Sequence, residues 1–196
     1  MLREKLRKFN IILASGSPRR QQFFKELDID FEIKLKPVDE IYSERLKGSN
    51  ISDYLAQIKA LPFKETLKPN DILITSDTIV WHEDKALGKP KSKEEAFNMI
   101  KSMSGKTHDV ISSVCFTMTD FAKTVNNVTK VTFKKFTDEE IHYYIDTFQP
   151  FDKAGAYGIQ EWIGQIGVTR LEGSYLNVMG MPMAKVYKVL TDIAER

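Results

Sequence analysis

The sequence predicts an α/β fold in which a mixed β-sheet is flanked by helices. Short β-branched runs, such as residues 72–74, alternate with stretches of helical spacing, such as residues 93–103. Some connections are long enough for a crossover helix, whereas the turn at Asp120 is short enough for a hairpin. No repeat or linker-like tract interrupts the 196 residues, so we expect a single domain over residues 1–196, either undivided or with two lobes around a cleft.

Near the N-terminus, a strand over residues 10–14 runs into a small-residue turn and then a helix. Ser17 is a suitable N-cap, and Pro18 occupies the first helical position, where its missing N–H has no cost. The N–H groups and the positive dipole end of such a helix favour anions. The turn adds hydroxyl and guanidinium donors from Ser15, Ser17, Arg19 and Arg20. A phosphate site is one interpretation, and a capped helix with solvated arginines fits these local features equally well.

The next segment supplies a carboxylate and a lysine that are not distinctive in isolation. A strand over residues 31–35 leads into a polar loop that contains Glu40. Acids in loops are usually only solvated. A helix is expected over residues 53–60, with Ser52 as its N-cap and Lys59 near its C-terminal end, where a helix favours a cation.

A strand in the middle of the chain contains a carboxylate. Residues 72–81 are mostly apolar and β-branched, apart from a polar insertion that includes Asp77 and Thr78. A carboxylate inside an apolar strand is costly unless it is paired, hydrogen-bonded or bound to a metal, so Asp77 is expected to have a specific role. A tight turn follows, and Pro90 stiffens the corner that carries Lys89. One carboxylate and one ammonium on neighbouring rigid segments indicate a centre for phosphate chemistry.

The second half of the chain continues the alternation of helices and strands. Capping-box patterns begin at Ser92 and Thr137. The expected elements are a helix over 93–103, antiparallel strands over 110–118 and 125–133, a helix over 138–148, a strand over 166–171 and a helix after Pro182. In the segment 151–160, Gly155 and Gly158 allow the backbone to approach another segment or a ligand closely.

Composition excludes several classes of protein. The formal net charge of +2 is too small to indicate nucleic acid as a stable partner, and basic and aromatic residues do not interleave on one strand. One cysteine, Cys115, excludes an internal disulfide and a multi-cysteine zinc site. No apolar run approaches the ~18 residues of a membrane span, and residues 1–8 lack the apolar region of a signal peptide. We therefore expect a soluble cytoplasmic protein.

Several segments together resemble the Maf family of nucleoside triphosphate pyrophosphatases. The matching segments, in the family's order, are residues 13–20, 76–80, 88–90, 104–108, 152–160 and 180–182. The resemblance implies a mixed-sheet α/β fold with a deep substrate cleft, and a homodimer. It also implies hydrolysis of a nucleoside triphosphate to the monophosphate and pyrophosphate, dependent on a divalent metal ion, Mg²⁺ or Mn²⁺.

The resemblance assigns roles residue by residue. Asp77 matches the family's catalytic carboxylate, and Asp77 with Glu40 is expected to hold the metal. The positions expected to bind substrate are Ser15, Ser17, Arg19, Arg20, Glu40, Lys59, Thr78, Lys89, Lys153 and Gln160. Arg19, Thr78 and Gln160 are similar to the trio of the branch that prefers dTTP and UTP. The chain departs from the family at Glu161 and Trp162, where the family usually has glycine.

Two other classes of function remain open from the residues alone. A nucleotide-binding regulator of cell division would use the same pocket without turnover. A module that binds RNA or DNA fits the sequence less well. For the enzyme, a role in house-cleaning of the nucleotide pool is expected, with CTP and modified pyrimidine nucleotides as further substrates.

Overall fold

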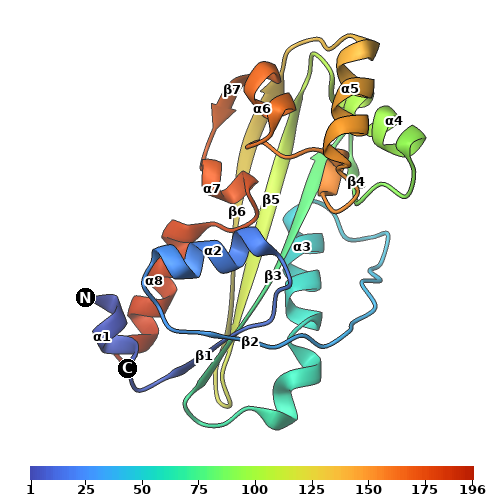
Figure 1. The fold of residues 1–196 in the computed structure, drawn as a ribbon. Coiled ribbons are helices and arrows are strands. Elements are labelled where there is room, and N and C mark those ends of the chain that lie inside the picture. The colour runs from blue at the N-terminus through green and yellow to red at the C-terminus, as the bar shows by residue number, and fades with distance from the viewer. The chain divides into compact units, whose positions relative to one another are not determined.

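The computed structural model describes residues 1–196, and its strands form a seven-stranded mixed sheet (Figure 1). The strands are β1 (Asn10–Leu13), β2 (Glu32–Ile33), β3 (Asp71–His82), β4 (Lys85–Leu87), β5 (Thr107–Thr117), β6 (Ala122–Phe133) and β7 (Val168–Glu172). The order is β2-β1-β3-β5-β6-β7, with β4 paired to β3 outside this path. β1 is parallel to β2 and β3, whereas β4 and β7 pair antiparallel with β3 and β6. The predicted mixed sheet is confirmed.

Ten helical segments accompany the sheet. The α-helices are α1 (Leu2–Leu6), α2 (Pro18–Glu26), α3 (Ser49–Ile58), α4 (Lys93–Met103), α5 (Asp138–Phe148), α6 (Trp162–Gly167), α7 (Tyr175–Val178) and α8 (Met183–Ala194). Two 3₁₀ segments are η1 (Leu61–Thr66) and η2 (Ala154–Ala156). None of these helices is long and apolar enough to cross a membrane.

The chain divides into two compact units. The first comprises residues 1–77, 112–127 and 180–196, and the second comprises residues 78–111 and 128–179. β3, β5 and β6 therefore contribute residues to both units. The single domain with a deep cleft stays a prediction.

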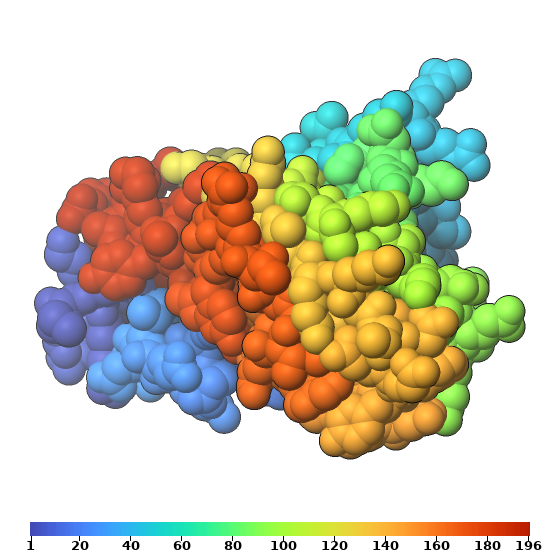
Figure 2. Space-filling view, turned by 90° about the horizontal axis from the view of Figure 1, so that it is seen from above, coloured from blue at the N-terminus to red at the C-terminus, as the bar shows by residue number.

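In the first unit, parallel strands and helices enclose an apolar core. Ile12 of β1 pairs with Leu73 of β3, and both are buried together with Ala60 and Phe63. α1 lies against α8, which brings the two ends of the chain together (Figure 1 and Figure 2).

The start of α3 differs from its prediction. The helix begins at Ser49 rather than at residue 53, and Gly48, with φ 52°, is its N-cap. Ser52, predicted as the cap, lies inside the helix and is fully buried. Its hydroxyl donates to the Ser49 carbonyl at 3.1 Å and shares a 2.7 Å hydrogen bond with the Ser113 hydroxyl. The prediction was wrong because a buried partner 61 residues away, rather than a helix N–H, satisfies this hydroxyl.

In the second unit, residues from β5 and β6 pack under α4 and α5 around a fully buried Val131. The capping box at Thr137 is confirmed, because the Thr137 hydroxyl and the Glu140 carboxylate both accept the expected backbone N–H groups. Only half of the box at Ser92 forms. The Ser92 hydroxyl accepts from the Glu95 N–H, but the Glu95 carboxylate accepts from Lys91 instead of from Ser92.

The predicted strand over residues 166–171 is wrong at its start. Residues Trp162–Gly167 form α6, and β7 begins only at Val168. A Cβ on Gly167 would lie 2.2 Å from the Phe136 ring, so this glycine lets the short helix pack directly on that ring. The apolar pattern of residues 166–171 could not reveal this tertiary contact.

Candidate active site

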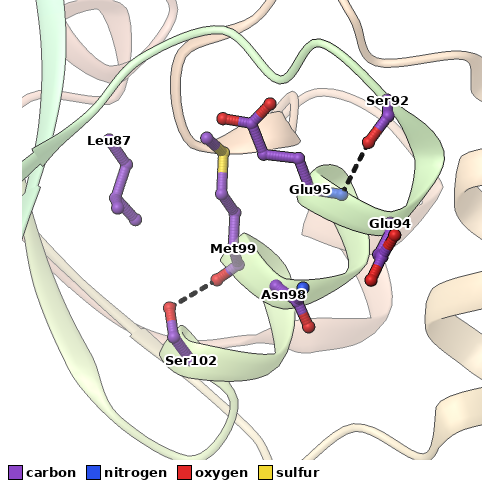
Figure 3. A pocket seen from close by; sticks show the side chains of 7 residues that line it. All are labelled: Leu87, Ser92, Glu94, Glu95, Asn98, Met99 and Ser102. Carbon is purple, nitrogen blue, oxygen red and sulfur yellow. Dashed lines mark hydrogen bonds between the residues drawn. The ribbon is translucent and has the colours of Figure 1, made fainter.

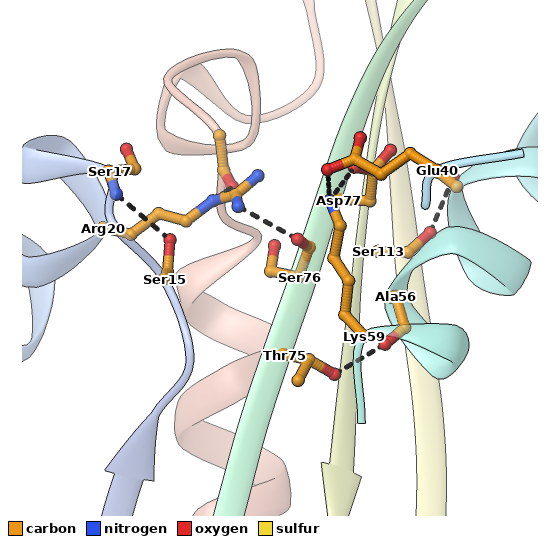
Figure 4. A network of polar contacts seen from close by, with 12 residues as sticks. Ser15, Ser17, Arg20, Glu40, Ala56, Lys59, Thr75, Ser76, Asp77 and Ser113 are labelled. Carbon is orange, nitrogen blue, oxygen red and sulfur yellow. Dashed lines mark hydrogen bonds and ion pairs between the residues drawn. The ribbon is translucent and has the colours of Figure 1, made fainter. Parts of the chain in front are cut away.

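Asp77, Lys59 and Glu40 form a charged group in the first unit (Figure 4). Asp77 lies on β3 and is 7% exposed, Lys59 follows the last residue of α3, and Glu40 lies in the loop before α3. The Lys59 ammonium lies 2.6 Å from an Asp77 carboxylate oxygen and 3.0 Å from a Glu40 oxygen. The predicted catalytic carboxylate therefore has its specific partner, and three predicted site residues lie together.

The face of β3 that carries Asp77 is turned toward α3. Side chains alternate along a strand, so Thr75 and Asp77 share one face, and Ser76 has the other. The Thr75 hydroxyl donates to the Ala56 carbonyl of α3 at 2.6 Å, which fixes this face against the helix. Lys59 directly follows α3, three positions after Ala56, and its ammonium reaches Asp77.

The turn before α2 is organised by its serines. The Ser15 hydroxyl accepts from the Ser17 N–H at 3.3 Å, and the Ser15 carbonyl accepts from the Gln21 side chain at 3.1 Å. Ser17 is the N-cap as predicted, with Pro18 at the first helical position, but its hydroxyl makes no capping hydrogen bond. The prediction of a strand, a turn and a helix N-terminus is confirmed here. Whether the turn binds an anion stays a prediction.

Arg20 connects α2 with two other segments of the first unit. Its Nε donates to the Gly180 carbonyl at 3.0 Å, and its Nη1 donates to the Ser76 carbonyl at 3.0 Å. Figure 4 shows Ser76 on the side of β3 that faces Arg20. Desolvation lowers the pKa of the Arg20 guanidinium from its ordinary value, while the Asp77 carboxylate acts in the opposite direction. Arginine nevertheless stays a cation, so Arg20 and Lys59 both offer positive charge near Asp77.

The predicted metal ligands are compatible with a magnesium-type ion. No group of three or more His, Cys, Asp and Glu side chains in residues 1–196 could enclose a metal. Mg²⁺ commonly takes only one or two protein carboxylates, with substrate phosphates and water completing its shell. Asp77 and Glu40 supply two carboxylates that already converge on one cation, the Lys59 ammonium. The donor set therefore fits the ion, with Lys59 as its competitor for the two carboxylates.

Of the remaining predicted residues, Arg19 lies on α2 in the first unit, whereas Thr78, Lys89, Lys153 and Gln160 belong to the second unit. Thr78 follows Asp77 on β3, and Lys89 is exposed in the turn between β4 and α4. The Gly155 N–H donates to the Gly88 carbonyl at 3.0 Å, which connects the Lys89 turn to the glycine-rich segment. Gly155 has φ 68°, and a Cβ there would lie 2.8 Å from Val80. The close approach predicted for this glycine is thus a contact with β3.

Lys153 and Gln160 lie at the two ends of the glycine-rich segment. Lys153 is only 8% exposed, and its ammonium pairs with Asp152 at 2.7 Å and with Glu161 at 3.1 Å. Gln160 is partly exposed. Sequence analysis identified Glu161 only as a departure from the family pattern. It also assigned no partner to Gly180, whose carbonyl accepts from Arg20.

A separate groove of about 430 Å³ lies beside α4 (Figure 3). Its lining residues are Leu87, Ser92, Glu94, Glu95, Asn98, Met99 and Ser102. None of the predicted site residues lines it. Its carboxylates disfavour a phosphate-bearing ligand, so it is not the predicted substrate site.

Together these features define an α/β protein whose first unit offers cations and carboxylates suited to a phosphate-bearing ligand. The chain belongs to the Maf family, since residues 10–193 match the family model described as Maf-like protein. A relative from Flavobacterium johnsoniae, named dTTP/UTP pyrophosphatase, is 63% identical over 98% of this chain and 100% of its own length. A relative of the same name from Bacteroides fragilis is 47% identical over 96% of this chain and 98% of its own length. The family resemblance read from the sequence is confirmed.

The fold also has a counterpart among solved structures. The Staphylococcus aureus Ham1 protein matches with a TM-score of 0.54 and 15% identity, over 94% of this chain and 99% of that chain. At this identity the similarity concerns the fold alone, and it agrees with the mixed-sheet α/β architecture.

Proposed function

We propose that this protein hydrolyses dTTP and UTP to the nucleoside monophosphate and pyrophosphate, as a house-cleaning enzyme of the nucleotide pool. The observation that carries the proposal is the group of Asp77, Lys59 and Glu40, with the Arg20 guanidinium nearby. The names of the Flavobacterium and Bacteroides relatives support it and favour turnover over a regulator that only binds nucleotides. CTP and modified pyrimidine nucleotides are secondary substrates in this proposal.

Cleavage between the α- and β-phosphates requires positive charge on the triphosphate and an activated water. Arg20, Lys59 and Lys89 neutralise the phosphates, and the serine turn before α2 donates hydrogen bonds to their oxygens. Asp77 accepts the proton of the attacking water. The fixed position of this carboxylate supports the role, because Asp77 is buried and the Lys59 ammonium at 2.6 Å holds it in one orientation.

Asp77 and Glu40 would hold the divalent ion, Mg²⁺ or Mn²⁺, which supplies charge neutralisation on the phosphates and a polarised water. The Lys59 ammonium pairs with the same two carboxylates, so it would compete with the ion for them. An ammonium freed from these acids would contribute its charge to the triphosphate. The position of Lys59 between two acids is what supports this part of the proposal.

Base preference is assigned to Gln160, together with Arg19 and Thr78, and Lys153 completes the proposed set of substrate-binding residues. A glutamine amide offers a carbonyl acceptor and an NH₂ donor side by side. Uracil and thymine present an N–H donor beside a carbonyl acceptor, so one amide can satisfy both. Cytosine presents the reverse order, which an amide can meet only by turning over.

The test is a panel of dTTP, UTP, CTP, GTP and 7-methyl-GTP with Mg²⁺ or Mn²⁺, scored for pyrophosphate and monophosphate. We expect dTTP and UTP to give the highest kcat/KM, with no turnover after metal removal by a chelator. Binding of UTP without pyrophosphate release would contradict the enzyme and support the regulator. Preference for 7-methyl-GTP would contradict the pyrimidine assignment and leave the reaction type standing.

We further propose that the protein is a homodimer that acts in the cytoplasm and has no stable nucleic acid partner. The Maf-family resemblance supports the dimer, and the small net charge supports the absence of a nucleic acid partner. Light scattering on the purified protein tests the oligomeric state, and cell fractionation tests the location. Salt-dependent binding of single-stranded DNA or RNA would contradict the last point.

A further inference from the structure

Glu161 lies at the centre of a buried polar network in the second unit. One of its carboxylate oxygens accepts a short hydrogen bond from the Tyr144 hydroxyl, and the other lies 3.1 Å from the Lys153 ammonium. The Tyr144 oxygen in turn accepts the Gly158 N–H at 3.0 Å. These residues, Tyr144, Lys153, Gly158 and Glu161, are referred to below as the Glu161 network.

The network holds the Glu161 carboxylate in one orientation. Tyr144 is fully buried, and the Glu161 side chain is 18% exposed. Burial first, and then the hydrogen bond to Glu161, raise the pKa of Tyr144 above its ordinary value, so the hydroxyl keeps its proton and donates it to the carboxylate. Tyr144 and Lys153 contact different oxygens of the Glu161 carboxylate, so rotation of this group would break both contacts.

The fixed carboxylate and the amide of Gln160 both lie beside Gly158. An added Cβ on Gly158 would meet a Glu161 oxygen, Oε2, at 2.9 Å and the Gln160 Nε2 at 3.1 Å. The carboxylate and the amide therefore approach the same point above the Gly158 backbone, and the absent side chain of Gly158 leaves them room. Oε2 is the oxygen that Tyr144 also contacts.

An anionic oxygen beside one end of an amide favours the NH₂ group there and disfavours the carbonyl, which carries a partial negative charge. We propose that Glu161 is a specificity-determining positioning residue that fixes which way the Gln160 amide is turned. This inference rests on the proposed function, in which Gln160 contacts the base. With its amide fixed, Gln160 presents donor and acceptor in the order that suits uracil and thymine. Turning over to meet cytosine would bring its carbonyl to the side of Gly158 that the Glu161 carboxylate also occupies.

The experiment compares kcat/KM for UTP and CTP on the full-length protein and its variants. Glu161→Gln keeps the shape of the side chain and removes its charge, and Tyr144→Phe removes the hydroxyl that orients it. The matched controls are Glu172→Gln, an exposed carboxylate on β7, and Tyr143→Phe, a half-exposed tyrosine on the same helix as Tyr144. Gln160→Glu serves as the reference for loss of base recognition. Because both substrates are measured on one preparation, the UTP-to-CTP ratio does not depend on how much of the protein is folded.

We expect Glu161→Gln to lower the UTP-to-CTP ratio about three-fold, the effect of one weak electrostatic preference, with a smaller decrease for Tyr144→Phe. Both controls should keep the wild-type ratio. A purely structural role would lower the melting temperature of Glu161→Gln and leave the ratio unchanged. If Gln160→Glu changes the ratio but Glu161→Gln and Tyr144→Phe do not, the inference about Glu161 is overturned and the proposed function stands. Absence of pyrophosphate release from any pyrimidine nucleotide by the wild type would overturn both.

Discussion

Replacing Lys59 with methionine tests whether Asp77 depends on its ammonium. Methionine keeps much of the length of the side chain and removes the charge. Asp77 is 7% exposed, and Lys59 is its hydrogen-bond partner at 2.6 Å. In the variant a largely buried carboxylate loses this partner. The reverse change, Asp77→Asn, leaves Lys59 paired with Glu40 at 3.0 Å.

The magnitude follows from this asymmetry. Removing one partner of a fully buried ion pair typically costs about 3–5 kcal/mol. The Asp77 side chain is 10% exposed and the Arg20 guanidinium stays nearby, so a smaller loss of about 2 kcal/mol is expected for Lys59→Met. For Asp77→Asn, Lys59 is 19% exposed and keeps Glu40, so a loss below about 1 kcal/mol is expected.

Urea unfolding at pH 7, followed by circular dichroism, measures both free energies of unfolding. The loss for Lys59→Met corresponds to a decrease of about 4–8 °C in melting temperature for a chain of this size. A Lys68→Met variant, whose side chain makes no ion pair with Asp77, controls for loss of a surface cation. If Lys59→Met is no less stable than Asp77→Asn, the reasoning that Asp77 relies on Lys59 is refuted.

Three further predictions concern catalysis, pH dependence and the glycine-rich segment. Asp77→Asn should keep the fold and lower kcat with UTP by ~10²–10⁴-fold, as loss of a general base does, and a rate within a few-fold of wild type would contradict the catalytic assignment. Burial lowers the pKa of His108 from 6.5 to about 3, so the unfolded chain binds a proton that the folded protein does not. The free energy of unfolding should therefore fall as the pH is lowered from 6.5 toward 4, and His108→Gln should flatten this dependence in urea titrations at several pH values. Gly155→Ala should destabilise the protein by about 1–3 kcal/mol, because its Cβ would meet Val80 at 2.8 Å and its φ of 68° disfavours alanine. Adding Val80→Ala should relieve only the steric part, which thermal melts of the single and double variants would separate.

Local patterns in the sequence determined most of the elements. The capping box at Thr137, Pro18 at the first position of α2 and the apolar periodicity of α4 all concern residues within one or two turns of each other. Such patterns act through backbone groups that lie near in sequence, so the chain itself carries the information. The same reasoning identified Asp77 as a carboxylate that needs a partner.

The tertiary structure decided which groups meet. Asp77 and Glu40 both reach the Lys59 ammonium because α3 and its preceding loop lie beside β3, and no local spacing encodes that arrangement. For Ser52 the local pattern was misleading. Serine is a good capping residue, but Ser52 lies inside α3, where its hydroxyl shares a hydrogen bond with the buried Ser113 hydroxyl.

The same holds at the end of the glycine-rich segment. From the sequence, Glu161 was only a residue that departs from a family pattern, because its partners Tyr144 and Lys153 lie 17 and 8 positions away. A side chain's partner depends on which elements become neighbours, and burial then makes an unpaired polar group too costly to keep. The sequence by itself could therefore show that Asp77 required a partner, whereas only the packing of α3 against β3 decided that the partner is Lys59.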